Sequence, residues 1–553
     1  MAALVESVMQ NLRTHYHQAL TLLQLRPGRG MPQRVKRIQL GEIELDLICL
    51  VTAVIVLLLS WKAFYKRSKK KTWNQPPTIP GGFPAIGNLM QLKEAKPHKT
   101  FTGWAAEHGP IFHVKLGNIN NVVINSAELA REVMITKHNS VSTRRLCTAL
   151  RIVNPEKTMV SMSDYDNDQY RMFKKLMVQH LVGPGPQHAN RPIRENAINA
   201  MVNDLYDSLD LEKSSLTDVR SCIRQVLFPF AIEQVFGYVP TGVYVPELNQ
   251  VFNRTQIFEA IFVAPLGAVT KVDLRDFFPA FRFVPNKPLE NSVQKVRSMT
   301  AWIVDALIED QKKLLAKRGH PTSCYADILL TQATHLTPLQ LQMALWEPLV
   351  ESGETSLMIT EWTMYEIARN PQIQHRLYEE INAAVSKSDR IVTEVHLDRL
   401  PLLTAVVKES FRMYPPVPIL PPRIVHEDTT LGGYVIPEGW DVLINIYGIQ
   451  MDPKVWSNPA KWDPDRVLND TTIDLGVTDL RIAPFGGGQR ICSGLQQVML
   501  IVPMMIATFV LHFHWSMPHS HSNDLEDRAA AEETVSLTTQ KLHPLKAVAT
   551  LRN

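Results

Sequence analysis

The chain has 553 residues, of which 45% are hydrophobic, so it can bury a sizeable core in one large globule or in several domains. Its formal net charge of +4 is small for this length, and no basic stripe interleaved with aromatic residues occurs, which argues against nucleic acid as a partner. The five cysteines are odd in number and widely spaced, so neither a disulfide framework nor a zinc-binding Cys-x-x-Cys pair fits, and a reducing compartment is favoured.

Residues 1–44 are predicted to form a basic N-terminal extension. Up to residue 41 they hold a single acid, Glu6, against six basic residues: Arg13, Arg26, Arg29, Arg34, Lys36 and Arg37. A leader of this composition is typical of a transit-like segment, of an amphipathic helix lying on a membrane surface, or of a solvated tail. The residues leave these three alternatives open.

Residues 45–65 are predicted to form a transmembrane anchor. The uncharged run Leu47 to Trp61 is slightly shorter than the roughly 20 residues that span a bilayer, although Leu45 and a snorkelling Lys62 extend it. The alternative is a buried core helix. Lysine and arginine crowd the C-terminal flank and acids the N-terminal flank, so the positive-inside rule places the bulk of the chain in the cytosol.

Two observations bear on that topology. The basic leader weakens it, because it too would prefer the cytosol. Asn253 and Asn469 begin glycosylation sequons, and glycans there would place the main part of the chain in the lumen.

Residues 66–84 are predicted to form a basic, proline-rich hinge, because prolines from Pro76 to Pro84 exclude a helix or a central strand. A plain linker is the alternative. Residues 85–553 contain no further low-complexity stretch or domain-scale linker, which predicts a single domain.

Apolar periodicity predicts a mainly α-helical globule with a small β region. The clearest predicted helices are Ile198 to Leu209, Gln294 to Ala316 and Trp362 to Ser386, and the predicted strands are Ile111 to Leu116, Asn121 to Ile124 and Asp441 to Ile446. No Gly-x-Gly-x-x-Gly motif follows a strand and no Gly-x-x-x-x-Gly-Lys motif occurs, so nicotinamide or ATP sites in this chain are not supported.

Two motifs in this helical region each place an acid close to a second polar group. Glu354 precedes Thr355, and an acid beside a hydroxyl can relay protons from solvent, although an ordinary helix surface also explains the pair. Glu409 and Arg412 are three residues apart, so they can pair on one helix face. A generic surface salt bridge is the alternative for the second motif.

The segment Phe485 to Gly494 suits a metal-binding thiolate. Cys492 precedes the apolar run Leu495 to Phe513, which is typical of a helix, and a helix N-terminus favours an anionic sulfur. Gly488 and Gly494 permit close approach to something flat, and Arg490 offers a fork of donors for a carboxylate. The alternative for an isolated cysteine is a small buried hydrophobic residue.

The order of Phe485, Gly488, Arg490, Cys492 and Gly494 matches Phe-x-x-Gly-x-Arg-x-Cys-x-Gly, so the chain resembles the cytochrome P450 haem-thiolate monooxygenases. The resemblance runs from Pro76 to about Pro544. It implies a single α-rich globule in which Cys492 is the axial ligand of the iron of haem b.

The same resemblance assigns roles to other motifs. Glu409, Arg412 and Arg466 match the ion-paired scaffold of the family. Glu354 and Thr355 match the acid–alcohol pair of its oxygen-binding helix, although Glu351-Ser352 replaces the usual Ala-Gly.

The haem carboxylates and the substrate are assigned by resemblance as well. Arg490 and Arg423 match residues that bind the haem carboxylates, and Tyr170 and Lys174 stand in place of a tryptophan and an arginine with that role. Four residues match a substrate wall: Val417, Ile419, Leu420 and Thr538.

Scattered phrases such as Trp346-Glu347-Pro348 are most similar to plant ent-kaurene oxidases. This resemblance implies stepwise oxidation of the C-4 methyl of ent-kaurene, a lipophilic diterpene, to the acid in gibberellin-type diterpenoid biosynthesis. Dioxygen is consumed, and electrons come from NADPH through a reductase partner, so this chain binds no NADPH. The expected location is the endoplasmic reticulum membrane with the catalytic domain cytosolic, or alternatively the plastid outer envelope.

Two classes of alternative stay open. One is a haem-thiolate enzyme that hydroxylates another terpenoid or lipophilic substrate, or rearranges a peroxide, although the acid–alcohol pair speaks against the latter. The other is a non-catalytic membrane haem protein that acts as a sensor or an interaction partner.

Overall fold

The structure is a computed structural model that describes residues 74–92, 96–165, 167–208, 215–322, 324–385, 390–518, 532–535 and 538–552. The predicted extension, the predicted anchor and the basic part of the predicted hinge lie outside these residues. From Pro76 to Asn553 the chain forms one unit by its internal contacts.

Helices dominate the described residues, as the apolar periodicity predicts. The long ones are α8 (Arg191–Ser208), α9 (Val219–Phe236), α13 (Lys287–Arg318), α15 (Pro338–Arg369), α16 (Pro371–Ala384), α18 (Pro401–Met413) and α21 (Leu495–His512). The shorter ones are α3 (Pro97–His108), α4 (Ala127–Arg131), α5 (Thr148–Val153), α6 (Asp168–Met177), α7 (Pro184–Ala189), α10 (Arg254–Phe258), α11 (Ala264–Val269), α12 (Leu274–Phe277), α14 (Tyr325–Gln332), α17 (Glu394–Leu397), α19 (Ile446–Gln450) and α20 (Asp465–Leu468). Single tight or wide turns are η1 (Leu89–Gln91), η2 (Glu132–Thr136), η3 (Val178–Val182), η4 (Pro246–Leu248), η5 (Glu259–Val263), η6 (Pro279–Phe281) and η7 (Gly488–Arg490).

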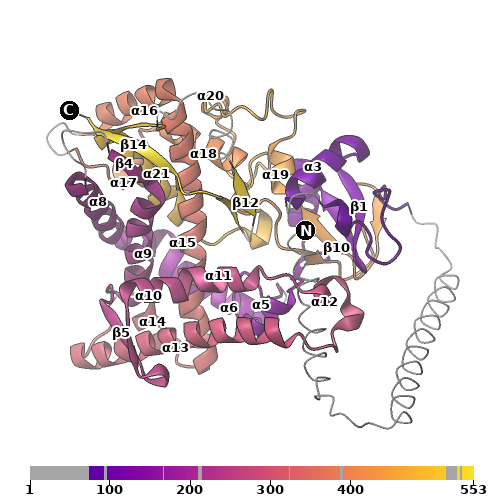
Figure 1. The fold of residues 1–553 in the computed structure, drawn as a ribbon, viewed down its shortest axis with the longest axis horizontal. Coiled ribbons are helices and arrows are strands. Elements are labelled where there is room, and N and C mark those ends of the chain that lie inside the picture. Colours follow the sequence, from indigo (N-terminus) through magenta and orange to yellow (C-terminus); the bar gives the residue numbers. More distant parts are fainter. Residues whose placement is uncertain are drawn as a thin grey trace, which may run out of the picture. The chain divides into compact units, whose positions relative to one another are not determined.

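Helix α15 passes through the middle of the globule and contacts α9, α13, α14, α16, α18 and α21 (Figure 1). It begins at a capping box, in which the Thr337 hydroxyl accepts a hydrogen bond from the Gln340 amide while the Gln340 side chain accepts one from Thr337. It ends at Arg369, because Pro371 begins α16 and has no amide hydrogen to continue the ladder. The predicted single helix from Trp362 to Ser386 is therefore wrong at Asn370.

The largest sheet has the strand order β1-β2-β10-β7-β3, from β1 (Ile111–Leu116), β2 (Ile119–Ile124), β10 (Asp441–Ile444), β7 (Arg423–Ile424) and β3 (Thr143–Arg144). Neighbours are antiparallel except β10 and β2, which are parallel. A second sheet has the order β11-β14-β4, from β11 (Phe513–Ser516), β14 (Lys546–Leu551) and β4 (Ser215–Asp218). The remaining strands pair in twos: β5 (Gly242–Val245) with β6 (Gln250–Asn253), β8 (Thr429–Leu431) with β9 (Tyr434–Ile436), and β12 (Glu533–Val535) with β13 (Thr539–Lys541).

The proline-rich part of the predicted hinge lies along β1. The His113 amide donates to the Pro77 carbonyl at 2.8 Å, and the Ile79 amide donates to the His113 carbonyl at 3.0 Å. Ile79 is buried in the core between this sheet and α3. Residues from Pro76 onward thus belong to the globule, ahead of the predicted boundary at 85.

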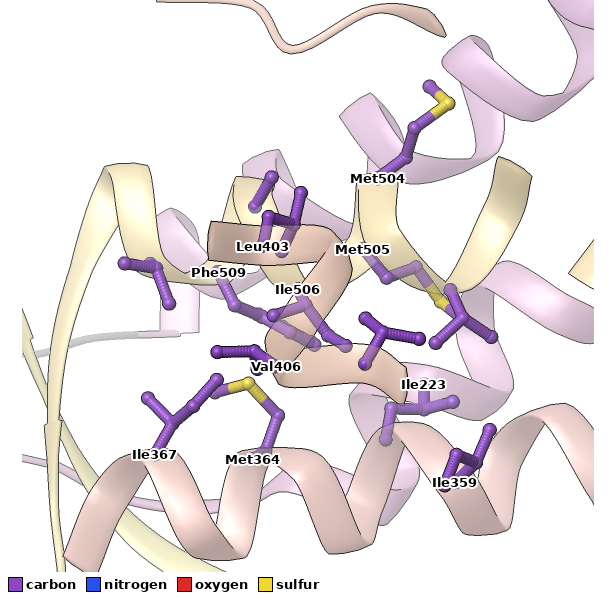
Figure 2. Close-up of a cluster of buried hydrophobic side chains, with 14 of the residues drawn as sticks. Ile223, Ile359, Met364, Ile367, Leu403, Val406, Met504, Met505, Ile506 and Phe509 are labelled. Atoms are coloured by element: carbon purple, nitrogen blue, oxygen red, sulfur yellow. The ribbon is translucent and has the colours of Figure 1, made fainter. Parts of the chain in front are cut away.

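The main core forms where α9, α15, α18 and α21 meet (Figure 2). Ile223, Ile359, Val406 and Phe509 are fully buried there, as expected for aliphatic and aromatic residues in a close-packed interior. Among the described residues α21 alone is long and apolar enough to cross a membrane, but 67% of its apolar window is buried, so it is a core helix here.

Candidate functional site

Cys492 lies in the loop between η7 and α21, two residues before Gly494, which caps α21. The Cys492 amide donates to the Phe485 carbonyl at 3.0 Å, and the Phe485 ring packs 5.1 Å from that of Phe411 on α18. These contacts fix the cysteine loop against the core. The side chain of Cys492 is exposed, so its sulfur is open to a ligand.

The surroundings of Cys492 disfavour a free thiolate. Desolvation by the protein around it raises the pKa of the Cys492 thiol to about 11, although the Gly494 amide lowers it through a hydrogen bond. Desolvation of the thiolate therefore outweighs the stabilisation that the N-terminus of α21 was expected to give it. A thiolate at this position needs a cationic partner such as a metal ion, which deprotonates the thiol that binds it.

The reason for a glycine at position 488 differs from the predicted one, which was close approach to a flat group. The φ angle of Gly488 is +64°, and a Cβ there would lie 2.1 Å from the Met134 carbonyl oxygen, so any side chain would clash with the η2 backbone. Gly488 is thus required for close approach of two backbone segments. Gly494 shows no such clash; a Cβ there would come no closer than 3.8 Å to the Cys492 sulfur.

Three arginines gather beside this loop, and Arg144 among them was missed by the sequence analysis. Arg144 on β3 and Arg423 on β7 face each other in strand register, and Arg490 follows on η7. Arg144 Nη1 donates to the Pro421 carbonyl at 2.7 Å, and Arg490 Nη2 to the Ser163 carbonyl at 2.9 Å. The adjacent Arg145 pairs with Asp441 instead, so the sequence alone could not tell which arginine points inward.

The arginine cluster, Arg144, Arg423 and Arg490, carries unbalanced positive charge. Arg144 Nε, Arg423 Nε and Arg490 Nη1 are buried and have no hydrogen-bond partner among the described residues. Burial and then mutual repulsion lower the pKa of Arg144 well below its usual range and that of Arg423 to about 10. Buried, unpaired guanidinium groups of this kind fit a ligand with carboxylates. The accessible Cys492 sulfur and the positively charged arginine cluster together fit haem, which has an iron and two propionates.

Tyr170 and Lys174 on α6 contact the backbone of the cysteine loop. Both donate to the Gln489 carbonyl, at 3.1 Å from the Tyr170 hydroxyl and 2.7 Å from Lys174 Nζ, and the Arg490 guanidinium lies 4.9 Å from the centre of the Tyr170 ring. They thus hold the backbone of the cysteine loop. A basic hollow of about 370 Å³ opens beside them, lined by Tyr165, Tyr170, Arg171, Lys174, Lys175, Val178 and Gln489.

Glu409, Arg412 and Arg466 meet as the sequence predicts. Arg412 donates to both carboxylate oxygens of Glu409, at 2.8 and 2.9 Å, and Arg466 Nε donates to Glu409 Oε1 at 3.1 Å. The Glu409 and Arg412 side chains are fully buried, so this is no surface pair. The trio joins α18 to α20 behind the cysteine loop.

Glu354 and Thr355 lie on α15. The Gln540 amide on β13 donates to the Glu354 carboxylate, while the charges of Arg224 and Arg220 lie near enough to lower its pKa. Burial is the larger effect, and the pKa of Glu354 is raised. Thr355 Oγ1 donates to the Glu351 carbonyl at 3.0 Å, which places the hydroxyl against its own helix.

Two more carboxylates on α15, Glu347 and Glu351, lie beside Ser161, and neither was predicted as a site residue. Glu347 is buried and accepts hydrogen bonds from the Val160 amide at 2.8 Å and from the Ser161 amide and hydroxyl at 2.9 and 3.1 Å. Burial, then the charge of Glu351, raises the pKa of Glu347 to about 8. Glu351 is exposed. Desolvation by the protein around it raises the pKa of its carboxyl as well, and a hydrogen bond with Ser161 opposes this shift.

The residues of the predicted substrate wall come from two segments that lie side by side. The Thr539 amide donates to the Pro416 carbonyl at 3.0 Å, which sets β13 beside Val417, and Gln540 Nε2 reaches the Thr538 hydroxyl at 3.3 Å as well as Glu354. Val417 and Leu420 pack with the core around η2, whereas Ile419 packs with the core between the first sheet and α3. Ile419 thus packs on a different side of this segment from Val417 and Leu420.

Comparison with known proteins places these features in context. A family model described as "Cytochrome P450" matches residues 76–543. An ent-kaurene oxidase of Salvia miltiorrhiza is 39% identical over 87% of this chain and 91% of its own, and ent-kaurene oxidase 2 of Oryza sativa subsp. japonica is 39% identical over 87% and 93%. An ent-sandaracopimaradiene 3-hydroxylase of the same rice is 38% identical over 85% of this chain and 90% of its own. A zebrafish cytochrome P450 solved with progesterone superposes with a TM-score of 0.66 at 20% identity, over 82% of this chain and 99% of that one.

Proposed function

The chain belongs to the cytochrome P450 family, and from this premise we propose that it oxidises the C-4 methyl of ent-kaurene stepwise to ent-kaurenoic acid in gibberellin-type diterpenoid biosynthesis. The observation that carries the proposal is the 39% identity to two ent-kaurene oxidases over most of both chains. As a member of the family the chain is an oxygen-dependent monooxygenase, its cofactor is haem iron, and a reductase supplies the electrons.

Four residues would hold the haem. Cys492 would provide the axial thiolate, and Arg144, Arg423 and Arg490 would pair with the propionates, which would balance their buried charge. When bound, a thiolate-ligated haem supplies the activation of dioxygen, which the thiolate promotes by pushing electron density toward the iron. Tyr170, Lys174 and the Glu409 trio would keep the cysteine loop in position.

Each oxidation consumes one dioxygen, two electrons and two protons; one oxygen atom enters the substrate and the other leaves as water. The protons must reach the reacting centre from solvent, and we assign their delivery to Glu354 and Thr355 on α15. Burial raises the pKa of Glu354, so it holds a proton more readily than an exposed carboxylate and can pass it on. Gln540 fixes the direction of this side chain.

The partner and the location belong to the same proposal. The basic hollow beside α6 lies next to the cysteine loop and suits an acidic surface of an NADPH-dependent reductase. Residues 45–65 would anchor the chain in the endoplasmic reticulum membrane, or alternatively in the plastid outer envelope, with residues 66–84 as the connection to the globule.

One specific observation favours a second candidate. The 38% identity to an ent-sandaracopimaradiene 3-hydroxylase is almost as high as that to the oxidases, so a single hydroxylation of another diterpene is the alternative.

Conversion of ent-kaurene by membranes that contain the full chain and a reductase tests the proposal. We expect ent-kaurenoic acid as the final product, and no product with Cys492→Ser, which should also lose the red-shifted carbon monoxide band of the reduced protein. A normal band without any oxidised ent-kaurene would contradict the substrate while leaving the family intact. Conversion of other ent-diterpenes to single alcohols would then support the second candidate.

A further inference from the structure

The segment Val160–Ser163 links the cysteine loop to one face of α15. Arg490 Nη2 donates to the Ser163 carbonyl at 2.9 Å, and Glu347 accepts from the Val160 and Ser161 amides. Glu347, Glu351 and Thr355 follow each other at four-residue spacing, so they share that face of the helix. The face that bears Glu351 is therefore turned toward the cysteine loop.

The loop that this segment contacts is the one that carries the cysteine. Arg490, which donates to the Ser163 carbonyl, is two residues before Cys492, and Ser161 donates to Glu347, one turn of α15 before Glu351. Glu351 thus lies on the face of α15 that is turned toward Arg490 and the cysteine loop.

Three of the five acids of this helix, Glu347, Glu351 and Glu354, differ in the number of hydrogen-bond and charged partners that they already have. Glu347 is buried and already accepts from three donors, and Glu354 accepts from Gln540 and has two arginine charges nearby. Glu351 is exposed, and Ser161 is the only hydrogen-bond partner that affects its pKa. Glu351 is therefore the carboxylate that remains accessible to a ligand.

We infer that Glu351, with the Ser161 hydroxyl beside it, binds the oxygen of the first oxidation product and so retains the alcohol for further oxidation of the same carbon. The inference rests on the proposed function. A hydrocarbon substrate has no group that Glu351 can bind, whereas the hydroxyl made in the first step can donate to its carboxylate. The site therefore gains affinity for its own intermediate once the substrate carries oxygen.

The same pair suits the next intermediate. Burial raises the pKa of Glu351, although a hydrogen bond with Ser161 opposes this, so its carboxyl holds a proton more readily than a solvated carboxyl does. A protonated carboxyl can donate to an aldehyde oxygen, whereas an ionised one accepts from an alcohol. One side chain can thus follow the substrate through both oxidation states.

The test compares Glu351→Ala with the wild-type holoenzyme for two ligands, ent-kaurene and the corresponding C-4 hydroxymethyl alcohol. Dissociation constants come from ligand-induced haem absorbance changes and from equilibrium partition of labelled ligand, neither of which needs turnover. We expect the alcohol to bind roughly ten- to a hundredfold more weakly to the variant, the usual effect of losing a hydrogen bond to a charged group, while ent-kaurene changes less than about twofold. Turnover should release the alcohol in place of the acid.

Two further variants keep the test decisive. Glu351→Gln keeps the shape and should recover part of the alcohol affinity, and Glu379→Ala removes an exposed carboxylate of α16 as a matched control that should change nothing. Equal weakening of both ligands, or unchanged alcohol binding, would overturn the inference and leave the proposed function standing. If the wild type binds neither diterpene, the proposed function fails, and the inference fails with it.

Discussion

At the scale of single residues, the sequence motif predicted that Glu409 pairs with Arg412 and Arg466, and the structure contains both ion pairs. The role of Cys492 as the metal ligand stays a prediction. The sequence could not locate Arg144, since the direction of a strand side chain depends on register, and Arg145 next to it looks equivalent. It assigned Tyr170 and Lys174 to the haem carboxylates, which stays a prediction, and it did not show that both donate to the Gln489 carbonyl. Which partner a donor finds is decided by packing that one sequence does not show.

Arg144 offers a direct test of the arginine cluster. Arg144→Leu removes a buried charge that no described carboxylate neutralises, so the free energy of unfolding of the haem-free protein should fall by less than about 1 kcal/mol or even rise. Haem should be lost roughly tenfold faster or more to an acceptor protein, because one propionate loses a charged partner. Arg151→Leu, which removes a half-exposed arginine outside the cluster, is the control. Unchanged haem loss in Arg144→Leu would remove Arg144 from the haem site.

Glu347 should make stability depend on pH. Its folded-state pKa of about 8 lies above the ordinary 4.5, so the folded state binds this proton more tightly than the unfolded state does. Its contribution to stability is therefore complete below about pH 4.5 and is lost as the pH rises toward about 8. Glu347→Gln cannot ionise, so its free energy of unfolding in urea should fall less steeply over that range, even though the lost acceptor lowers stability at every pH.

Glu379→Gln serves as the control for that experiment, because Glu379 is exposed and should leave the slope of the wild type unchanged. Parallel curves for wild type and Glu347→Gln would show that Glu347 does not carry the raised pKa.

At the scale of elements, hydrophobic periodicity found the helices but not all of their ends. The predicted helix from Trp362 to Ser386 contains the break between α15 and α16, although Asn370-Pro371 is a recognisable stop signal. The strand predicted to reach Ile446 ends at Ile444, because Ile446 starts α19. The apolar run after Cys492 is α21 as expected, and its burial, which composition cannot reveal, makes it part of the core.

The contribution of α21 to the core can be measured at Phe509. Its side chain is fully buried among residues of α15 and α18 (Figure 2). Its ring lies 5.3 Å from that of Trp515. Phe509→Ala should lower the free energy of unfolding by about 3–5 kcal/mol through lost burial and a residual cavity. Leu314→Ala, at a position 37% exposed on α13, should cost less than about 1 kcal/mol. Equal effects in denaturant unfolding would contradict the placement of α21.

At the scale of the whole molecule, the fold brings residues from segments far apart in the described chain to one site. Arg144, Glu351, Arg423 and Cys492 come from β3, α15, β7 and the cysteine loop, and only the motif around Cys492 is contiguous in sequence. The family resemblance named Arg423 and Cys492 for this site, but neither Arg144 nor Glu351. Periodicity alone predicts helices and short strands without saying which of them meet.

The second sheet gives a test at this scale. Ala549 on β14 is almost fully buried, whereas its neighbour Thr550 is exposed. Ala549→Glu buries a charge between two partner strands and should cost several kcal/mol, seen as a lowered melting temperature and faster proteolysis, while Thr550→Glu should have little effect. Equal melting temperatures for the two variants would contradict the central position of β14.

That position has a consequence for the order of synthesis. β14 pairs with β11 on one side and with β4 on the other. Strand β4 is therefore synthesised more than 300 residues before the strand with which it pairs. Domains fold as their residues emerge, and long-range strand pairing is slow, so β4 and the start of α9 should stay unprotected in nascent chains. Release of residues 546–551 is therefore the event that completes the sheet, and a stalled chain that lacks them should be a target for chaperones.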